Sequence, residues 1–180
     1  DIILGSYEVK PEYAGKSLAE IAKLENKTPA RMLVELIARL DECDKTNKDG
    51  CRENIMATSM SEADIKKLMQ WPYTCICSDG SSKGTHPRGF GAFTRVLGKY
   101  VRMEKTLSFA EAVHKMTGLT AKQLGIKKRG LIKTGYYADL VIFNPETVED
   151  KATVAEPHKL SEGIEKVWVN GKIVFENKKT

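Results

Sequence analysis

The chain centres on the stretch Tyr73-Thr-Cys-Ile-Cys-Ser-Asp-Gly-Ser-Ser-Lys-Gly-Thr-His-Pro-Arg88, which carries its densest cluster of reactive side chains. The partly β-branched run over residues 73–77 predicts a strand, which ends at Ser78-Asp79-Gly80 before a glycine- and serine-rich loop leads into a helix. In α/β proteins, ligands are commonly held by the loops that follow the carboxyl ends of strands, so Asp79 is a candidate functional residue. Asp-Gly is also one of the commonest turn dipeptides, and a simple turn is the competing interpretation.

The strand pattern also predicts which side chains share a face. Because side chains alternate between the two faces of a regular strand, Tyr73, Cys75, Cys77 and Asp79 would all point inward. Asp79 would then stand at the end of a column of inward side chains. We interpret the two cysteines beneath it as small apolar fillers rather than as soft metal ligands, because buried free cysteines usually serve that way.

Composition places the chain among ordinary globular proteins. Its 180 residues suit one domain, or one domain with a small appendage, and its hydrophobic content is 41%. The sequence shows no apolar run long enough for a bilayer and no signal peptide, which argues against a membrane partner. The net charge of +5 permits nucleic-acid binding, but the lysines are dispersed, which argues against a nucleic-acid partner. The chain opens at Asp1 without methionine, in strand-like sequence, which suggests a piece of a longer protein.

The four cysteines favour a cytoplasmic protein with reduced thiols. No secretory signal accompanies them, and Cys75 and Cys77 are too close along one strand for an easy disulfide. Cys43 and Cys51 flank a polar loop that has no histidine nearby to complete a zinc set. The cysteines therefore predict neither disulfides nor a structural zinc site.

Capping and periodicity predict a series of helices and strands. Capping pairs predict helices after Ser17, Ser61, Ser108 and Thr120, a Thr28-Pro29 start predicts another, and apolar spacing predicts a further helix from Gly89. Residues 41–54 form a polar loop. Strands are expected over residues 2–7, 55–60, 73–77, 130–132, 138–143 and 167–175, with Asn170-Gly171 as a hairpin turn. The order predicts an α/β fold followed by a small β unit.

Several motifs together resemble the C-terminal part of the N-acyl-D-amino-acid deacylases, metal-dependent enzymes of the amidohydrolase superfamily. After Ser78-Asp79-Gly80 and His86-Pro87-Arg88 come Gly91-Ala-Phe-Thr-Arg-Val-Leu-Gly-Lys-Tyr-Val-Arg102, Ala112-Val-His-Lys-Met-Thr117 and Arg129-Gly-Leu-Ile-Lys-Thr-Gly-Tyr-Tyr-Ala-Asp-Leu-Val-Ile-Phe143. The last motif is shared widely among amidohydrolases. The His-Pro-Arg and Phe-Thr-Arg-Val-Leu-Gly motifs narrow the resemblance to the deacylases.

The resemblance implies part of a TIM-like barrel and part of a small β-sandwich. A complete barrel takes roughly 250 residues, so this chain would supply a C-terminal fragment of it. We expect residues 1–129 to form closing strands and helices of the barrel, with residues 73–77 as its last strand. Residues 130–180 would form C-terminal strands of the sandwich.

The resemblance also implies a reaction and roles for three residues. The family hydrolyses N-acyl-D-amino acids, the implied substrate, to a carboxylate and a D-amino acid, with zinc activating water. Asp79 matches the aspartate that exchanges protons during catalysis, and Arg88 matches the arginine that binds the substrate α-carboxylate. His86 either contacts substrate or fixes the loop. Most zinc ligands of the family lie upstream, so the chain is expected to hold no complete metal site, with Asp79 as a candidate ligand.

The sequence is also compatible with two other functions. One is hydrolysis of a cyclic amide, as in the hydantoinases, although the His-Pro-Arg motif favours an acyclic substrate. The other is a non-catalytic binding or assembly module. If the chain is a deacylase fragment, we expect it to be inactive in isolation and to need the missing N-terminal barrel portion as a partner. Its exposed strand edges predict self-association.

Overall fold

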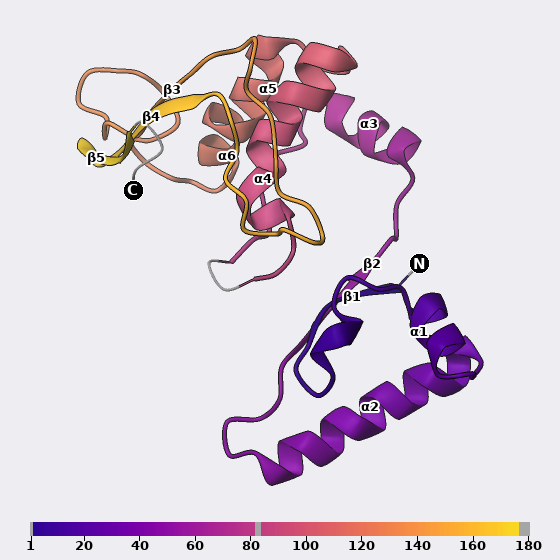
Figure 1. Ribbon diagram of the computed structural model, residues 1–180. Helices are drawn as coiled ribbons and strands as arrows, with labels where there is room; N and C mark the ends of the chain where they lie inside the picture. The colour runs from indigo at the N-terminus through magenta and orange to yellow at the C-terminus, as the bar shows by residue number, and fades with distance from the viewer. Residues whose placement is uncertain (1, 82–83, 177–180) are drawn as a thin grey trace.

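The computed structural model describes residues 2–81 and 84–176, which fold into two lobes (Figure 1). The first lobe, residues 2–57, contains β1 (Ile2–Tyr7), a 3-10 turn (Pro11–Tyr13), α1 (Leu18–Leu24), α2 (Pro29–Thr46) and β2 (Glu53–Ala57). The second lobe, residues 62–176, contains α3 (Glu62–Gln70), α4 (Arg88–Arg95), a π-helix (Val96–Met103), α5 (Phe109–Met116), α6 (Gly118–Gln123), β3 (Leu140–Phe143), β4 (Ile164–Val169) and β5 (Lys172–Glu176). The expected mixed α/β composition is therefore confirmed.

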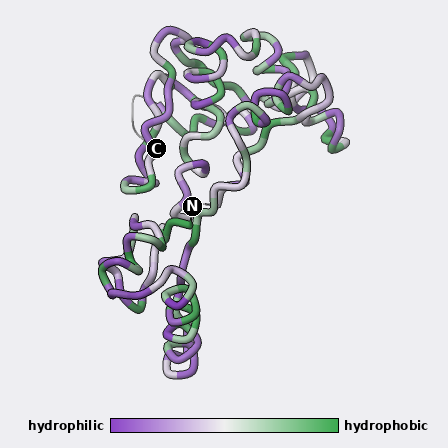
Figure 2. Tube along the Cα trace, turned by 90° about the vertical axis from the view of Figure 1, so that its right-hand side faces the viewer, coloured by the Kyte–Doolittle hydropathy of each residue, from purple (hydrophilic) through white to green (hydrophobic). Residues whose placement is uncertain are grey.

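The first lobe packs two helices against a two-stranded antiparallel sheet. β1 pairs with β2 from Ile2 opposite Ala57 to Tyr7 opposite Glu53. Its core contains Leu4, Tyr7, Tyr13, Leu18, Ile21, Ala22, Met32 and Leu36. The Tyr7 hydroxyl donates to the Leu36 carbonyl at 2.7 Å, which satisfies a buried polar group and ties α2 to the sheet. Hydrophobic and hydrophilic residues are interspersed along α2 (Figure 2), and its buried residues Met32 and Leu36 are four positions apart, the spacing of one helix face.

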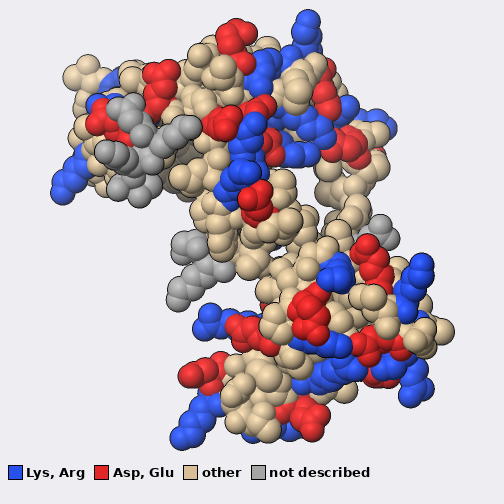
Figure 3. Space-filling view, viewed as in Figure 1, with Lys and Arg blue, Asp and Glu red and all other residues tan. Residues whose placement is uncertain are grey.

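The second lobe has its own core beneath a three-stranded antiparallel sheet in the order β3-β4-β5. Its buried residues are Ile76, Val96, Leu97, Tyr100, Leu107, Ala112 and Val148. The expected hairpin is confirmed: Asn170 and Gly171 join β4 to β5 with φ angles of 52° and 77°, the left-handed conformation that favours these two residue types. Acidic and basic side chains are interspersed over both lobes on the face shown in Figure 3.

The expected strand over residues 73–77 is wrong. No neighbouring strand pairs with this segment in the described structure, and helices α5 and α6 satisfy its backbone instead. The Ile76 amide donates to the Lys115 carbonyl at 3.2 Å, and the Gln123 amide group donates to the Tyr73 carbonyl at 2.8 Å. Cys77 is exposed and Tyr73 is 69% exposed, so the predicted inward column of side chains does not form.

Four smaller expectations are also corrected. Helix α2 continues to Thr46 instead of ending before a loop at Asp41, because the Asp41–Lys45 ion pair supports one more turn. Helix α6 begins at Gly118, so Thr120 lies inside it and bonds back to the Lys115 carbonyl instead of capping. Residues 130–132 form no strand. Cys43 and Cys51 form a disulfide between the end of α2 and the approach to β2, because α2 brings their Cα atoms to 5.9 Å.

The described strands form two separate sheets and no closed barrel. The barrel and sandwich assignments, with their boundary at residues 129 and 130, therefore stay predictions. Among the described residues, no helix combines the length and the apolar character needed to cross a membrane.

We expect Lys115→Met to destabilise the second lobe. Lys115 is 4% exposed, and its ammonium donates to the Trp71 and Thr74 carbonyls. Removing this donor leaves the Thr74 carbonyl without it and the Trp71 carbonyl with the Thr74 amide alone, at a cost of roughly 1–3 kcal/mol. Urea unfolding followed by tryptophan fluorescence measures the loss. The exposed Lys122 in α6 supplies the control, Lys122→Met; equal unfolding midpoints for the two variants would contradict the structural role of Lys115.

Candidate functional site

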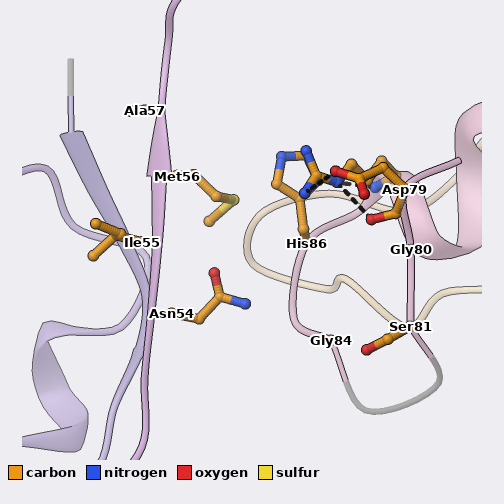
Figure 4. Close-up of a pocket in the computed structure, with 10 residues that line it drawn as sticks. Asn54, Ile55, Met56, Ala57, Asp79, Gly80, Ser81, Gly84 and His86 are labelled. Atoms are coloured by element: carbon orange, nitrogen blue, oxygen red, sulfur yellow. Dashed lines mark hydrogen bonds and ion pairs between the residues drawn. The ribbon is translucent and has the colours of Figure 1, made fainter.

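A polar cavity of about 440 Å³ lies between β2 of the first lobe and the loop that precedes α4. Its lining from β2 consists of Asn54, Ile55, Met56 and Ala57. The loop and the start of α4 contribute Asp79, Gly80, Ser81, Gly84, His86 and Arg88 (Figure 4). The three predicted site residues therefore line one cavity, although none of them follows a strand.

Asp79 and Arg88 bind one another. The Arg88 Nη2 atom lies 2.8 Å from the Asp79 Oδ2 atom, and Arg88 Nε donates to the Asp79 main-chain carbonyl at 3.1 Å. Both side chains are solvent-accessible, at 76% exposure for Asp79 and 48% for Arg88. Arg88 is the first residue of α4, where the helix dipole disfavours a cation, and the adjacent carboxylate offsets that cost.

His86 holds the turn that leads to Arg88. Its Nδ1 atom accepts a hydrogen bond from the Arg88 backbone amide at 3.1 Å, so the neutral ring carries its proton on Nε2 (Figure 4). Partial burial lowers the pKa of His86, the Arg88 cation lowers it further, and Asp79 opposes both. The site thus presents a neutral imidazole with one N–H to donate, beside a carboxylate and a guanidinium.

A close contact between two glycines shapes the loop. A Cβ atom on Gly80 would lie 2.3 Å from the Gly89 Cα atom, far inside van der Waals contact. Gly80 follows Asp79 and Gly89 follows Arg88, so this backbone contact brings the two charged residues together. The Asp79 backbone helps, because it adopts the left-handed conformation at φ 46°, which aspartate tolerates better than most residues.

Asn54 and Met56 are site residues that the sequence analysis missed. Both are partly buried and face the loop from β2, whereas Ile55 points away (Figure 4). Alternation along the strand was readable from the sequence, but nothing in the sequence indicated which segment would face it. Gly5 of β1 makes room for this packing, since a Cβ atom there would lie 2.9 Å from the Met56 Cε atom.

The described residues do not fit a complete metal centre. Within residues 2–81 and 84–176, no group of three or more His, Cys, Asp or Glu side chains converges as metal ligands would. The Cys75 thiol donates to the Gln123 Oε1 atom at 2.9 Å, away from Asp79. The Asp79 carboxylate is held by Arg88. The chemistry that these residues can perform themselves is therefore proton transfer and the binding of a charged ligand.

We expect Gly80→Ala to open the loop. The added methyl group would force the Gly80 and Gly89 backbones apart, and overpacking of this kind costs roughly 1–3 kcal/mol. The measurement is the free energy of unfolding in urea. Gly89→Ala is the matched control, because its Cβ atom would lie 3.5 Å from its nearest neighbour, the Ser81 carbonyl oxygen. If Gly80→Ala is no less stable than Gly89→Ala, the close contact does not exist in solution.

We expect His86 to titrate below its ordinary pKa of 6.5. The folded state then binds fewer protons than the unfolded state, so the stabilisation is complete above pH 6.5 and is lost as the pH falls through the lower pKa of the folded protein. An NMR titration of the imidazole measures the pKa, with His86→Gln identifying the resonance. Arg88→Gln should raise the pKa, because a nearby cation is removed. The control is Arg95→Gln, which removes the same charge from the same helix and should change the pKa of His86 little. A His86 pKa above 6.5 in the unsubstituted chain would contradict the geometry.

Comparisons with known proteins agree with this architecture. The profile of the Amidohydrolase family matches residues 52–175. The N-acyl-D-aspartate deacylase of Alcaligenes xylosoxydans xylosoxydans is 46% identical over 123 residues, which cover 67% of this chain and 25% of that protein. The D-aminoacylase of the same organism is 36% identical over 168 residues, covering 92% of this chain and 32% of the enzyme.

Solved structures extend the similarity to the fold. A D-aminoacylase studied for its binuclear metal center superposes with a TM-score of 0.83 at 36% identity, covering 99% of this chain and 35% of that one. The N-acyl-D-glutamate deacylase of Bordetella bronchiseptica, in complex with zinc and a phosphonate inhibitor, superposes with a TM-score of 0.83 at 35% identity. The superposition covers 100% of this chain and 35% of the deacylase chain. The chain thus spans about a third of these proteins. It belongs to the amidohydrolase family and is homologous to the N-acyl-D-amino-acid deacylases.

Proposed function

We propose that this chain is the part of an N-acyl-D-amino-acid deacylase that supplies the proton-transferring carboxylate and the substrate-binding arginine. The observation that carries the proposal is the pairing of Asp79 with Arg88 on the wall of a polar cavity. The homology supports the reaction class, since the relatives at 36% to 46% identity are a D-aminoacylase and an N-acyl-D-aspartate deacylase. The reaction is hydrolysis of the amide bond to a carboxylate and a D-amino acid.

Asp79 acts as the general base and then as the general acid. It takes a proton from the attacking water as the water oxygen bonds to the amide carbon. It then gives that proton to the amide nitrogen as the carbon–nitrogen bond breaks, which leaves a carboxylate and an amine. The solvent-accessible position of the Asp79 carboxylate suits a group that exchanges protons with water.

Arg88 binds the α-carboxylate of the substrate. Its planar guanidinium can meet a carboxylate through two parallel hydrogen bonds, and it already holds the carboxylate of Asp79. A substrate carboxylate would take the place of Asp79 on the guanidinium. His86 donates from Nε2 to a substrate oxygen, because its Nδ1 atom is occupied by the Arg88 amide.

The zinc that the family resemblance implies needs ligands from beyond the described residues. Asp79 is the only predicted ligand among them, and it is held by Arg88. The proposal therefore includes the remainder of a deacylase fold as the partner that completes the site. Consistent with this, the D-aminoacylase and glutamate deacylase structures each extend well beyond the 35% that this chain covers.

A chimera tests the proposal. In it, this chain replaces the matching third of the Alcaligenes D-aminoacylase, and hydrolysis of N-acetyl-D-amino acids is measured. We expect turnover, and a loss of roughly 10²–10⁴-fold for Asp79→Asn, because an amide cannot carry the proton. Asp41→Asn, an exposed aspartate on α2, is the matched control.

Besides an inactive chimera, three outcomes would contradict the proposal. Full activity in the Asp79→Asn chimera would remove the proton-transfer role. Hydrolysis of a hydantoin in place of the N-acetyl-D-amino acid would favour the cyclic-amide alternative. Turnover by the isolated chain with added zinc would show that its own residues hold a complete site.

A further inference from the structure

A segment distant in sequence fastens the loop that carries His86 and Arg88. Residues 148–161 descend along α4 toward this loop before the chain enters β4 (Figure 1). His158 Nε2 lies 2.9 Å from the Gly84 carbonyl oxygen, and the His158 ring packs against the Phe90 ring with centroids 5.0 Å apart. Because a carbonyl can only accept, the His158 ring must donate from Nε2.

Ser161 binds the first turns of helix α4, on the other side of the tripeptide. Its hydroxyl donates to the Phe90 carbonyl at 3.0 Å, and its Oγ atom lies 2.6 Å from the Thr94 Oγ1 atom inside α4. Gly84 lies two residues before His86, and Phe90 lies two residues after Arg88. The two hydrogen bonds therefore bracket the His86-Pro87-Arg88 tripeptide.

The segment itself is well anchored along α4 and the π-helix that follows it. Asp150 pairs with Arg95 at 2.9 Å. Gly91 and Gly98 permit the close approach, because a Cβ atom on either would lie 2.9 Å from an atom of Asp150 or Val148. Because residues 148–161 are fixed to the same helix as Arg88, their contacts with the loop can restrain the position of the Arg88 guanidinium.

The ion pair with Asp79 is too weak to restrain Arg88 by itself. Both partners are exposed, and exposed pairs contribute little because water and salt screen them. Substrate binding, moreover, would displace Asp79 from the guanidinium. Arg88 then depends on its backbone for its position, and the two bracketing hydrogen bonds hold that backbone together with the Gly80–Gly89 contact.

We propose that His158 and Ser161 are positioning residues that hold the His86-Pro87-Arg88 tripeptide and so set how strongly the site prefers a substrate with an α-carboxylate. This inference rests on the proposed function of Arg88. Neither residue lines the cavity, so both act through the loop.

Hydrogen exchange in the chain itself is the first test. The Gly89 amide bonds to the His86 carbonyl, and the Phe90 and Gly91 amides bond to the Pro87 carbonyl, so these amides report on the turn. In His158→Ala and in Ser161→Ala we expect them to exchange about fivefold faster, the factor that one typical net hydrogen bond contributes. His158→Gln keeps a donor and should restore slow exchange. Lys159→Ala removes only an exposed pair with Glu156 and is the control. Unchanged exchange in both alanine variants would overturn the proposal.

Substrate discrimination in the chimera is the second test. The measured quantity is the ratio of kcat/KM for an N-acetyl-D-amino acid to that for the same compound with a carboxamide in place of its carboxylate. We expect this ratio to fall about fivefold in His158→Ala through a higher KM, and to recover in His158→Gln. Faster exchange with an unchanged ratio would overturn the link to specificity. If the unsubstituted chimera is inactive, the proposed function fails, while the exchange measurement still decides whether the two residues hold the loop.

Discussion

The contact between the Gly80 and Gly89 backbones is the constraint on which the site depends. It closes the loop between Asp79 and Arg88, which are nine positions apart in the sequence, so that their side chains meet at 2.8 Å. A side chain at Gly80 would open the loop and separate the charges. The two glycines thus fix an arrangement that their charged neighbours could not enforce, because an exposed ion pair contributes too little free energy to close a loop of this length.

The electrostatics of the loop point to an anionic ligand. An arginine at the first residue of a helix faces the positive end of the helix dipole, which disfavours it. The neighbouring histidine is kept neutral by partial burial and by that same arginine. Stability alone would be served better by an acidic residue at this position. A carboxylate that bound here would gain from the guanidinium and from the helix dipole together.

Local signals in the sequence predicted local structure well. The Ser17 and Ser108 capping boxes, the Thr28-Pro29 start and the Asn170-Gly171 turn form as expected, because each depends only on residues within a few positions. The strand over residues 73–77 was wrong because a strand needs a neighbour, and α5 and α6 lie beside this segment instead. The Cys43–Cys51 disulfide was missed because the extra turns of α2 that bring the cysteines together were missed as well.

The same distinction applies to the site. Asp79, His86 and Arg88 share one short stretch and carry a family motif, so the sequence could nominate them as candidates, whereas Met56 and His158 reach the loop across the fold. His158 bonds to a residue 74 positions away, and no periodicity or spacing marks such a pair. A sequence motif identifies candidate reactive groups. The residues that pack around those groups, such as Met56 and His158, are brought there by the fold, which the motif does not encode.

The pairing of Asp79 with Arg88 also couples binding to catalysis in the proposed reaction. Without substrate, the Asp79 carboxylate lies against the Arg88 guanidinium, with 2.8 Å between Oδ2 and Nη2. A substrate carboxylate that binds Arg88 would compete with Asp79 for the same donors, and the released Asp79 oxygens would then be free to bind the attacking water. A ligand without the carboxylate leaves the pair intact. In the proposed reaction, Arg88 would therefore select the substrate in two ways. It would bind the α-carboxylate, and it would release Asp79 only when that carboxylate is present.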